Sequence, residues 1–299
     1  MTADQGIAAD RGAATPSPLA PDGPLDGFPG GTASELFGQI TAQASSRLRQ
    51  LGRLRAGAPP TLVAVAHGSR HPRASATVRA LLDAVRTLRP GLPVRLGHIE
   101  LNEPLLTDTL AAVRGPAVLV PLLFTRGHHV THDLPQALAA APRVQGRIAA
   151  PLGPHPLLAS ALHARLTEAG WTPAHRRGAG VVLAAAGSRS PDSAADTART
   201  AALLSDRLGG VPVQPAYASA CTPTLDEAVS LLRARGCRRI AVASCFAAPG
   251  LFASRMSTAA PWISAAPLGT HPALARLVLR RYDETATAAA TPGAELASA

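Results

Sequence analysis

The sequence predicts an α/β protein with two similar domains, each a parallel sheet flanked by helices. Two observations carry this prediction. Short, β-branched apolar runs alternate with segments of helical periodicity, and the links between them are short, which is typical of parallel α/β sheets. The pattern of the first half of the chain then recurs in the second half, which indicates a tandem duplication.

The first domain begins with residues 61–66 (TLVAVA), an apolar run expected to form a buried strand. Residues 74–88 follow as a helix, because apolar side chains fall on one face: Val78, Leu81, Leu82, Val85 and Leu88. Pro104 is expected in the first turn of the next helix. The elements expected after the first helix are a strand over 93–101, a helix over 104–113, a strand over 117–124, a helix over 134–141, a strand over 147–152 and a helix over 156–169.

The duplication is visible as strings that recur in the same order. VVLAAAGSR (181–189) matches LVAVAHGSR (62–70), and VPVQPAYASACTPTLDEAV (211–229) matches LPVRLGHIELNEPLLTDTL (92–110), both at an offset of 119 residues. A third string, APLGxHPxL, begins at residue 150 and again at residue 266. Chance similarity between Ala-rich segments is a poor explanation for strings that recur in this way.

These matches set the expected domain boundaries. We expect a first domain over 59–174 and a degenerate repeat over 178–283. Residues 1–58 are rich in small and polar residues and are expected to be largely disordered, although apolar spacing over 34–55 favours a helix there. Residues 284–299 are Ala- and Thr-rich and are expected to form a flexible tail.

The charge of the chain is +10, from 29 arginines, no lysine and 19 acidic residues. Residues 1–58 hold five arginines and five acids, so the predicted domains carry the whole surplus. The arginines reflect either GC-rich coding or an anionic ligand, which the guanidinium group suits. Aromatic residues are only 3% of the chain, which argues against a protein that stacks nucleic-acid bases.

The cysteine pattern and the apolar runs indicate in which cellular compartment the protein is expected. Cys221, Cys237 and Cys245 fit neither a CxxC motif nor a disulfide framework, so we expect free, buried thiols. No apolar run approaches the roughly 18–20 residues of a membrane span, and the first residues do not resemble a signal peptide. We therefore expect a cytoplasmic protein that binds no membrane.

Comparing the two copies singles out three residues of the first domain: His67, Glu100 and His129. The matching positions of the second copy are Ala186, Ser219 and Phe252. The three first-copy residues each follow or end a predicted strand, and ligands of parallel sheets bind at the carboxyl ends of the strands. Two imidazoles and a carboxylate suit Fe²⁺, Co²⁺, Ni²⁺ or Zn²⁺, and they also accept protons near neutral pH.

Several neighbouring residues leave alternatives open. Glu103 is better placed at a helix start, where the helix dipole favours an acid, so Glu100 is preferred for the site. The residues alone do not decide which of the histidines at 128, 129 and 132 points inward. Asp133 can orient a histidine or cap the helix that begins at Leu134, and we favour capping.

Other motifs have structural explanations of equal or greater weight. The turn Gly68-Ser69-Arg70 can hold an anion on its backbone N–H groups, but the second copy keeps the same three residue types without the histidine. A structural turn explains this at least as well. His98, His155 and His271 are expected to be structural, and the last two share an HP string at a helix start.

The combined motifs resemble the CbiX/SirB-type sirohydrochlorin chelatases. The resemblance rests on HGSR (67–70), on E-x-x-E-P (100–104) and on VPLLFTRGHHVTHDLP (120–135). In the last string the family's G-x-H-x-x-x-D-x-P spacing is met by Gly127, His129, Asp133 and Pro135. The resemblance covers about 61–170 well and 181–283 weakly.

This resemblance implies an enzyme that inserts Fe²⁺, for sirohaem, or Co²⁺, for cobalamin, into sirohydrochlorin. By motif position, His67 and His129 match the family's metal-handling histidines and Glu100 its acidic site residue. The metal is a substrate, and no permanently bound cofactor or iron–sulfur cluster is expected. The candidate contacts to the polycarboxylate substrate are Ser69, Arg70, Arg73, Arg126 and Gly127.

The resemblance also bears on assembly and on rival functions. Short family members pair two single-domain subunits, so a duplicated chain implies a fused pair, either a monomer or a weak homodimer. The second half would then only shape the cleft. The main alternative is a non-catalytic carrier of metal or tetrapyrrole, and a nucleic-acid-binding protein is suggested only by the basic charge. The sequence does not separate iron from cobalt or nickel.

Overall fold

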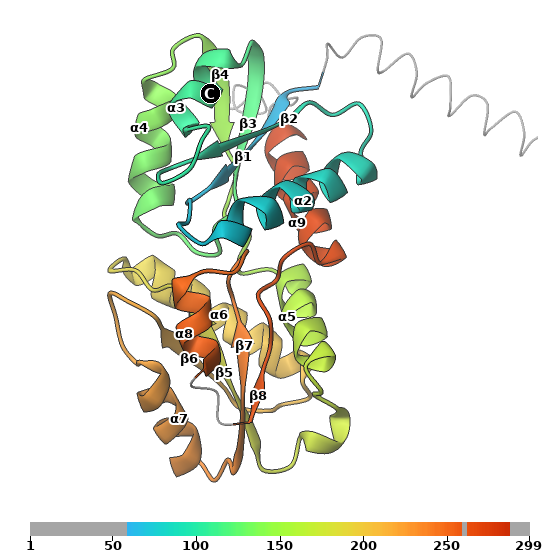
Figure 1. Ribbon diagram of the computed structural model, residues 1–299, viewed down its shortest axis with the longest axis vertical. Helices are drawn as coiled ribbons and strands as arrows, with labels where there is room; N and C mark the ends of the chain where they lie inside the picture. Colours follow the sequence, from blue (N-terminus) through green and yellow to red (C-terminus); the bar gives the residue numbers. More distant parts are fainter. Residues whose placement is uncertain (1–58, 259–261, 288–299) are drawn as a thin grey trace, which may run out of the picture. The chain divides into compact units, whose positions relative to one another are not determined.

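Two parallel four-stranded sheets form the framework of the computed structural model, which describes residues 59–258 and 262–287 (Figure 1). The described residues belong to one unit, residues 58–299. The helix predicted over 34–55, the disorder predicted for 1–58 and the tail beyond residue 287 lie outside the described residues.

The first sheet has the strand order β2-β1-β3-β4. Its strands are β1 (Thr61–Ala66), β2 (Val94–His98), β3 (Gly115–Pro121) and β4 (Val144–Ile148). Strand β1 lies between two parallel neighbours and is buried from Leu62 onward, as its apolar, β-branched sequence predicts. The helices that follow these strands are α2 (Pro72–Leu88), α3 (Leu106–Ala112) and α4 (Leu134–Ala139), with a π-helical turn, η1 (His129–Asp133), before α4.

The second sheet repeats the first, with the strand order β6-β5-β7-β8. Its strands are β5 (Ala179–Ala185), β6 (Val213–Tyr217), β7 (Arg239–Ser244) and β8 (Ile263–Ser264). The remaining helices are α5 (Pro156–Glu168), α6 (Pro191–Arg207), α7 (Leu225–Ala234), α8 (Leu251–Thr258) and α9 (Pro272–Thr287), with a short turn, η2 (Pro173–His175). The predicted fold class is confirmed, because both halves form the same parallel α/β arrangement.

Several predicted elements differ in their limits, among them the strand predicted over 117–124, which occupies Gly115–Pro121. The strand predicted over 93–101 ends at His98, and the next backbone N–H groups, of Ile99 and Glu100, donate to Ala66 at the end of β1 and to His67 in the loop that follows. The strand predicted over 147–152 occupies Val144–Ile148. The helix predicted from Pro104 begins at Leu106, because the Pro104 carbonyl accepts the backbone N–H of His98 and belongs to the connection.

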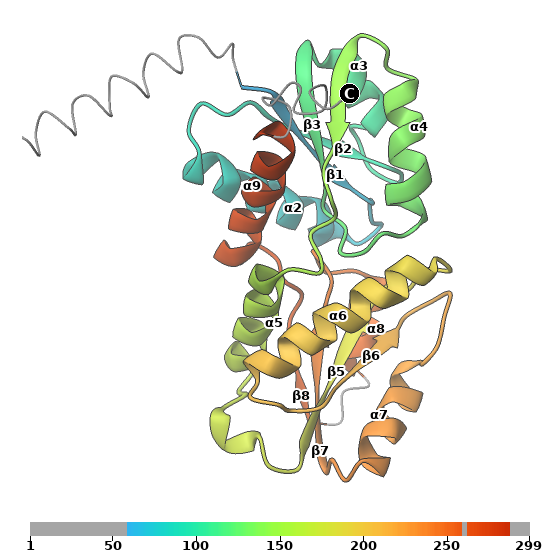
Figure 2. The ribbon, with the colours of Figure 1, turned by 180° about the vertical axis from the view of Figure 1, so that it is seen from behind.

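The last helix of each repeat packs on the other repeat's sheet. Helix α9 contacts α2 and β3 of the first sheet, and helix α5 contacts α6 and β7 of the second (Figures 1 and 2). The segments 59–174 and 178–283 therefore exchange their last helices, which the repeat in the sequence did not predict. We call the first sheet with α2–α4 and α9 the first lobe, and the second sheet with α5–α8 the second lobe.

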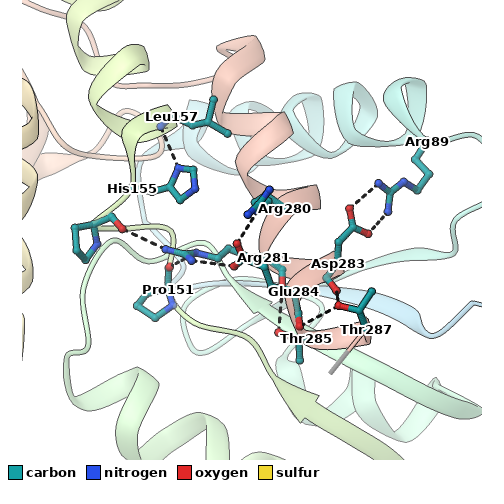
Figure 3. A network of polar contacts seen from close by, with 11 residues as sticks. Arg89, Pro151, His155, Leu157, Arg280, Arg281, Asp283, Glu284, Thr285 and Thr287 are labelled. Carbon is teal, nitrogen blue, oxygen red and sulfur yellow. Dashed lines mark hydrogen bonds and ion pairs between the residues drawn. The ribbon is translucent and has the colours of Figure 1, made fainter. Parts of the chain in front are cut away.

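Polar contacts hold α9 in its exchanged position (Figure 3). Arg281 donates to the carbonyl oxygens of Pro151 at 2.8 Å and of Pro154 at 3.3 Å, and it pairs with Glu284 at 3.0 Å. Arg89, at the end of α2, pairs with Asp283. Residues 284–287 are thus helical and anchored, although the sequence predicted a flexible tail from residue 284 onward.

The HP strings have the shared structural role that the sequence predicted. His155 Nδ1 accepts the backbone N–H of Leu157 at 3.0 Å, and His271 Nδ1 accepts that of Ala273 at 3.1 Å. Each imidazole therefore caps the N-terminus of one exchanged helix. Burial lowers the pKa of both rings, which favours the neutral form that this cap requires.

The largest apolar core runs through both lobes. It joins Leu62 and Val120 of the first sheet to Val181 and Leu183 of the second, with α5 and α9 between them. Smaller apolar clusters lie under α7 and under α3 and α4. Within the described ranges, no helix is long and apolar enough to span a membrane.

The cysteines agree in part with the expectation. All of them are free, and Cys237 and Cys245 are buried as predicted, whereas Cys221 is half-buried. Burial raises the pKa of the Cys245 thiol to about 12.

Candidate functional site at the carboxyl edge of the first sheet

His67 and Glu100 meet where β1 and β2 end. The backbone of Gly68 has φ +108°, and a side chain there would come within 1.8 Å of the Glu100 carbonyl oxygen, so this close approach requires glycine. The Glu100 N–H donates to the His67 carbonyl at 3.0 Å. His67 Nδ1 consequently lies 3.5 Å from Glu100 Oε1, with both side chains roughly half exposed.

His129 reaches the same place from β3. Its ring meets the His67 ring edge to face, with centroids 4.6 Å apart and planes at 86°. Of the three neighbouring histidines, His129 is the one that contacts His67. His128 and His132 instead stack on each other, with centroids 4.5 Å apart. The preference for His129 in the family motif therefore agrees with the geometry.

Asp133 orients His129 and does not cap α4. Its Oδ2 lies 2.5 Å from His129 Nδ1, and it makes no side-chain hydrogen bond to the start of α4. The prediction of capping was wrong because the chain is already helical at Asp133, and the N–H of Leu134 donates to the His129 carbonyl within the π-helical turn. Such a carboxylate fixes the ring position and the proton arrangement of an imidazole.

The two imidazoles face a cleft of about 850 Å³ that both lobes line. On the second lobe, the cleft is lined by the residues that match the three candidates, namely Ala186, Ser219 and Phe252. The repeat-matched positions therefore face one shared space. Sequence comparison identified these positions, and their place at the cleft agrees with the expectation that the second half shapes it.

The wall from the second lobe includes an exposed apolar part. Leu251 and Phe252 are 62% and 39% exposed, and both line the cleft together with Phe246. Leu101 of the first lobe is another exposed apolar residue at the cleft. Exposed apolar side chains gathered in a concave site are typical of a ligand surface.

The predicted substrate contacts separate into two groups. Ser69, Arg70 and Gly127 line the cleft. Arg126 does not line it, because its Nε and Nη2 donate to Asp196 at 3.0 and 2.8 Å. Arg73 does not line it either.

The turn at Ser69 is largely satisfied within the protein. The Ser69 N–H donates to Asn102 Oδ1 at 2.6 Å, and the Ser69 hydroxyl accepts the N–H of His71 at 3.1 Å. The structural explanation of this turn therefore holds, and its anion-binding capacity is smaller than its sequence suggests. Asn102 was not predicted, since nothing in its local sequence marks it as a partner of this turn.

His67 is the common partner of the other two candidates, Glu100 and His129. Among residues 59–258 and 262–287, no group of three or more His, Cys, Asp or Glu side chains is arranged to hold a metal ion. His67 contacts both Glu100 and His129, and the assignment of all three as metal ligands stays a prediction.

The CbiX family model matches residues 61–169 and 180–285. The chain belongs to the CbiX family. The resemblance predicted from the sequence motifs is thus confirmed, and the second copy matches the same family model as the first. The sirohydrochlorin ferrochelatase of Bacillus subtilis is 30% identical over 177 residues, which cover 56% of this chain and 66% of that protein.

Other CbiX-family relatives are matched over one repeat or by their fold. The sirohydrochlorin cobaltochelatase of Methanosarcina acetivorans is 28% identical over 123 residues, which cover 36% of this chain and 95% of that protein. The structure of SirB from Bacillus subtilis with Fe³⁺ has a TM-score of 0.64 at 23% identity, covering 78% of this chain and 97% of that chain. This likeness shows that both repeats together form the same fold.

Proposed function

We propose that the chain is a sirohydrochlorin chelatase, which inserts a divalent metal ion, Fe²⁺ or Co²⁺, into a polycarboxylate tetrapyrrole. The observation that carries the proposal is the contact of His67 with His129 at the cleft of a CbiX-family chain. Relatives named as ferrochelatase and as cobaltochelatase support the same reaction class.

Metal insertion must remove two pyrrole protons and deliver a partly dehydrated ion to the centre of the ring. Neutral imidazoles at His67 and His129 would bind the ion and accept protons. Asp133 and Glu100 stand behind these rings and would stabilise the imidazolium ions that form. Two imidazoles leave other coordination positions open, so the ion can be released to the substrate.

The cleft suits a flat, acidic macrocycle. Its volume of about 850 Å³ lies in the range of ordinary ligand sites. Leu251 and Phe252 would contact one face of the ring, and the Arg70 guanidinium is placed to meet carboxylate side chains at the cleft. Arg126 is given no such role, because Asp196 occupies its guanidinium.

We propose one site per chain, in a cytoplasmic protein that acts as a monomer. Each lobe supplies one wall of the cleft, so a single chain already contains both halves of the site. The free thiols suit a reducing compartment. No permanently bound cofactor is part of the proposal, since the metal is consumed as a substrate.

The test is an anaerobic absorbance assay of sirohydrochlorin with Fe²⁺ or Co²⁺, separately and in competition. We expect many turnovers per chain, and a loss of about 10²- to 10⁴-fold in rate for His67→Ala and for His129→Ala. His132→Ala is the matched control, because this exposed ring stacks on His128 and not on the candidate pair. Stoichiometric binding without turnover would instead identify a carrier.

A further inference from the structure

The second lobe holds the loop that carries His129. This loop connects β3 to the π-helical turn, and its residues Thr125 and Arg126 lie against the first half of α6. Thr125 Oγ1 is 2.8 Å from Ser193 Oγ. Ser190 Oγ donates to the Arg126 carbonyl at 3.1 Å, and the Arg126 N–H donates to Asp196 Oδ2 at 3.0 Å. Both backbone polar groups of Arg126 are therefore bound by the opposite lobe.

Asp196 is the centre of this contact. Only 1% of the residue is exposed, and its carboxylate accepts one backbone and two guanidinium hydrogen bonds from Arg126. Burial by itself would raise the pKa of Asp196, but the hydrogen bonds and charge of Arg126 hold this pKa below its ordinary value. A buried carboxylate paired in this way restricts its partner closely, because without Arg126 the carboxylate of Asp196 would be a buried charge without compensation.

Among the described residues, this contact occurs on only one side of the duplicated molecule. The offset of the first two repeat strings places Thr77 at the position that matches Asp196, and the loop alignment places Pro249 opposite Arg126. Thr77 donates to the Arg73 carbonyl within its own helix, and a proline has no N–H to donate. By contrast, the approach of Gly127 to Ser188 recurs as the approach of Gly250 to Ser69. The asymmetric contact thus belongs to the loop that ends in a histidine.

We infer that Asp196 is a positioning residue for His129. It fixes the backbone of Arg126, three residues before His129, and so holds the imidazole against His67. The inference rests on the proposed function of the cleft. It also gives the second lobe, which lacks both imidazoles, a role in the chemistry of the first.

The test compares Asp196→Asn with Asp192→Asn in the full chain. Asp192 lies on the same helix and 3.6 Å from the same guanidinium, but its side chain is 58% exposed. At saturating Co²⁺ and sirohydrochlorin, we expect kcat of the Asp196 variant to fall about 10- to 100-fold, since small misplacements of reacting groups have effects of this size. The KM for sirohydrochlorin should stay within about twofold, because the apolar wall is untouched. The Asp192 variant should match the wild type.

Thermal unfolding is measured for each variant, to check that the assay temperature lies below the unfolding transition of that variant. If Asp196→Asn does not fold, Ser190→Ala replaces it. Ser190 makes no capping hydrogen bond to α6, so this change removes only the bond to the Arg126 carbonyl. We expect a fall in kcat of roughly threefold to tenfold. An unchanged kcat in folded Asp196→Asn, or in Ser190→Ala as its replacement, overturns the inference.

A second measurement uses Co²⁺ alone, so that the inference does not depend on turnover. Binding is followed by the visible absorption of the ion, and we expect at least about fivefold weaker binding by Asp196→Asn than by the wild type. If the wild-type chain binds Co²⁺ but inserts none, the proposed function is wrong. If, in that case, the wild type and Asp196→Asn also bind Co²⁺ with equal affinity, the positioning role is wrong as well. A wild-type chain that neither binds nor inserts Co²⁺ defeats both.

Discussion

Asp133 illustrates how one residue controls the chemistry of another. Its carboxylate lies 2.5 Å from His129 Nδ1 and makes no capping bond to α4. Replacing it by asparagine should leave the helix intact but free the imidazole to rotate and to change its proton arrangement. We expect Asp133→Asn to weaken Co²⁺ binding and to lower kcat, each by about 10- to 100-fold.

Titration with Co²⁺ and the insertion assay check this expectation. Asp206→Asn is the control, because Asp206 is an exposed acid on α6 away from the cleft. If Asp133→Asn binds and inserts Co²⁺ as the wild type does, His129 does not depend on this partner.

The residues of the candidate site were predictable to the extent that the duplication reveals them. His67, Glu100 and His129 stand out because the second copy has lost all of them, and the structure brings them together. The role of Asp133 was not predictable, since capping and orienting require the same residue at the same spacing. The engagement of Arg126 was not predictable either, because its partner Asp196 is 70 residues away.

At the scale of elements, the two exchanged helices are capped by imidazoles that must be neutral. Burial first, then Arg281 facing His155 and Arg165 facing His271, lowers the pKa of these rings, while Glu284 and Glu168 oppose the shift. The unfolded chain therefore binds more protons than the folded chain as the pH falls below about 6.5. The free energy of unfolding should decrease as the pH falls. The contribution of the two caps to this free energy should be fully present above the ordinary histidine pKa.

The double variant His155→Asn, His271→Asn tests this, because asparagine caps helices well and does not titrate in this range. We expect a flatter dependence of Tm on pH between about 7.5 and 5.5 than in the wild type. Alanine at either position should instead cost about 1 kcal/mol of stability above the ordinary histidine pKa, and this cost should shrink as the pH falls, because the protonated wild-type ring no longer accepts the capping hydrogen bond. His132→Asn, an exposed ring, is the control. A pH dependence unchanged by the double variant would show that other groups cause it.

The start of α8 presents the apolar wall of the cleft. Leu251 and Phe252 occupy the positions of His128 and His129 in the repeat, and both are exposed to the cleft. Removing both side chains should raise the KM for sirohydrochlorin about 10- to 100-fold, because each can bury apolar area worth roughly 1.5–3 kcal/mol in full. The kcat should stay within about twofold, since the imidazoles are untouched.

Steady-state kinetics of Leu251→Ala, Phe252→Ala measure this split. Leu231→Ala is the control, because Leu231 is an exposed apolar residue on α7 that does not line the cleft. A fall in kcat with an unchanged KM would assign the wall to the reaction and not to binding.

The order and type of the secondary-structure elements could be predicted from the apolar pattern, but the first and last residues of several elements could not. The buried strands were predicted well because β-branched runs bounded by polar turns have few other stable arrangements. Helix α3 begins at Leu106 and not at Pro104, because the Pro104 carbonyl accepts a hydrogen bond from the backbone N–H of His98. Local sequence does not report such contacts.

For the molecule as a whole, the duplication predicted two similar sheets but not the exchange of their last helices. Helices α5 and α9 have the same HP start and similar apolar patterns, so each fits either sheet by sequence alone. The structure places each on the sheet of the other repeat. The two lobes consequently share one continuous core, and the cleft lies between walls that are joined through both exchanged helices.

This shared core predicts that the two sheets unfold together. In calorimetry of the full chain we expect the sheets to give a single transition, with a calorimetric enthalpy equal to the van't Hoff enthalpy. Arg281→Ala should lower the Tm of that transition without splitting it, because the residue joins α9 to the segment that leads into α5. Leaving the carbonyl oxygens of Pro151 and Pro154 without this donor should cost about 1–3 kcal/mol, or roughly 2–10 °C, while Glu284 keeps its pair with Arg280. Arg280→Ala is the control, since Arg280 pairs only with Glu284 among the described contacts. Two resolved transitions of the sheets would show that each lobe is stable without the other's helix.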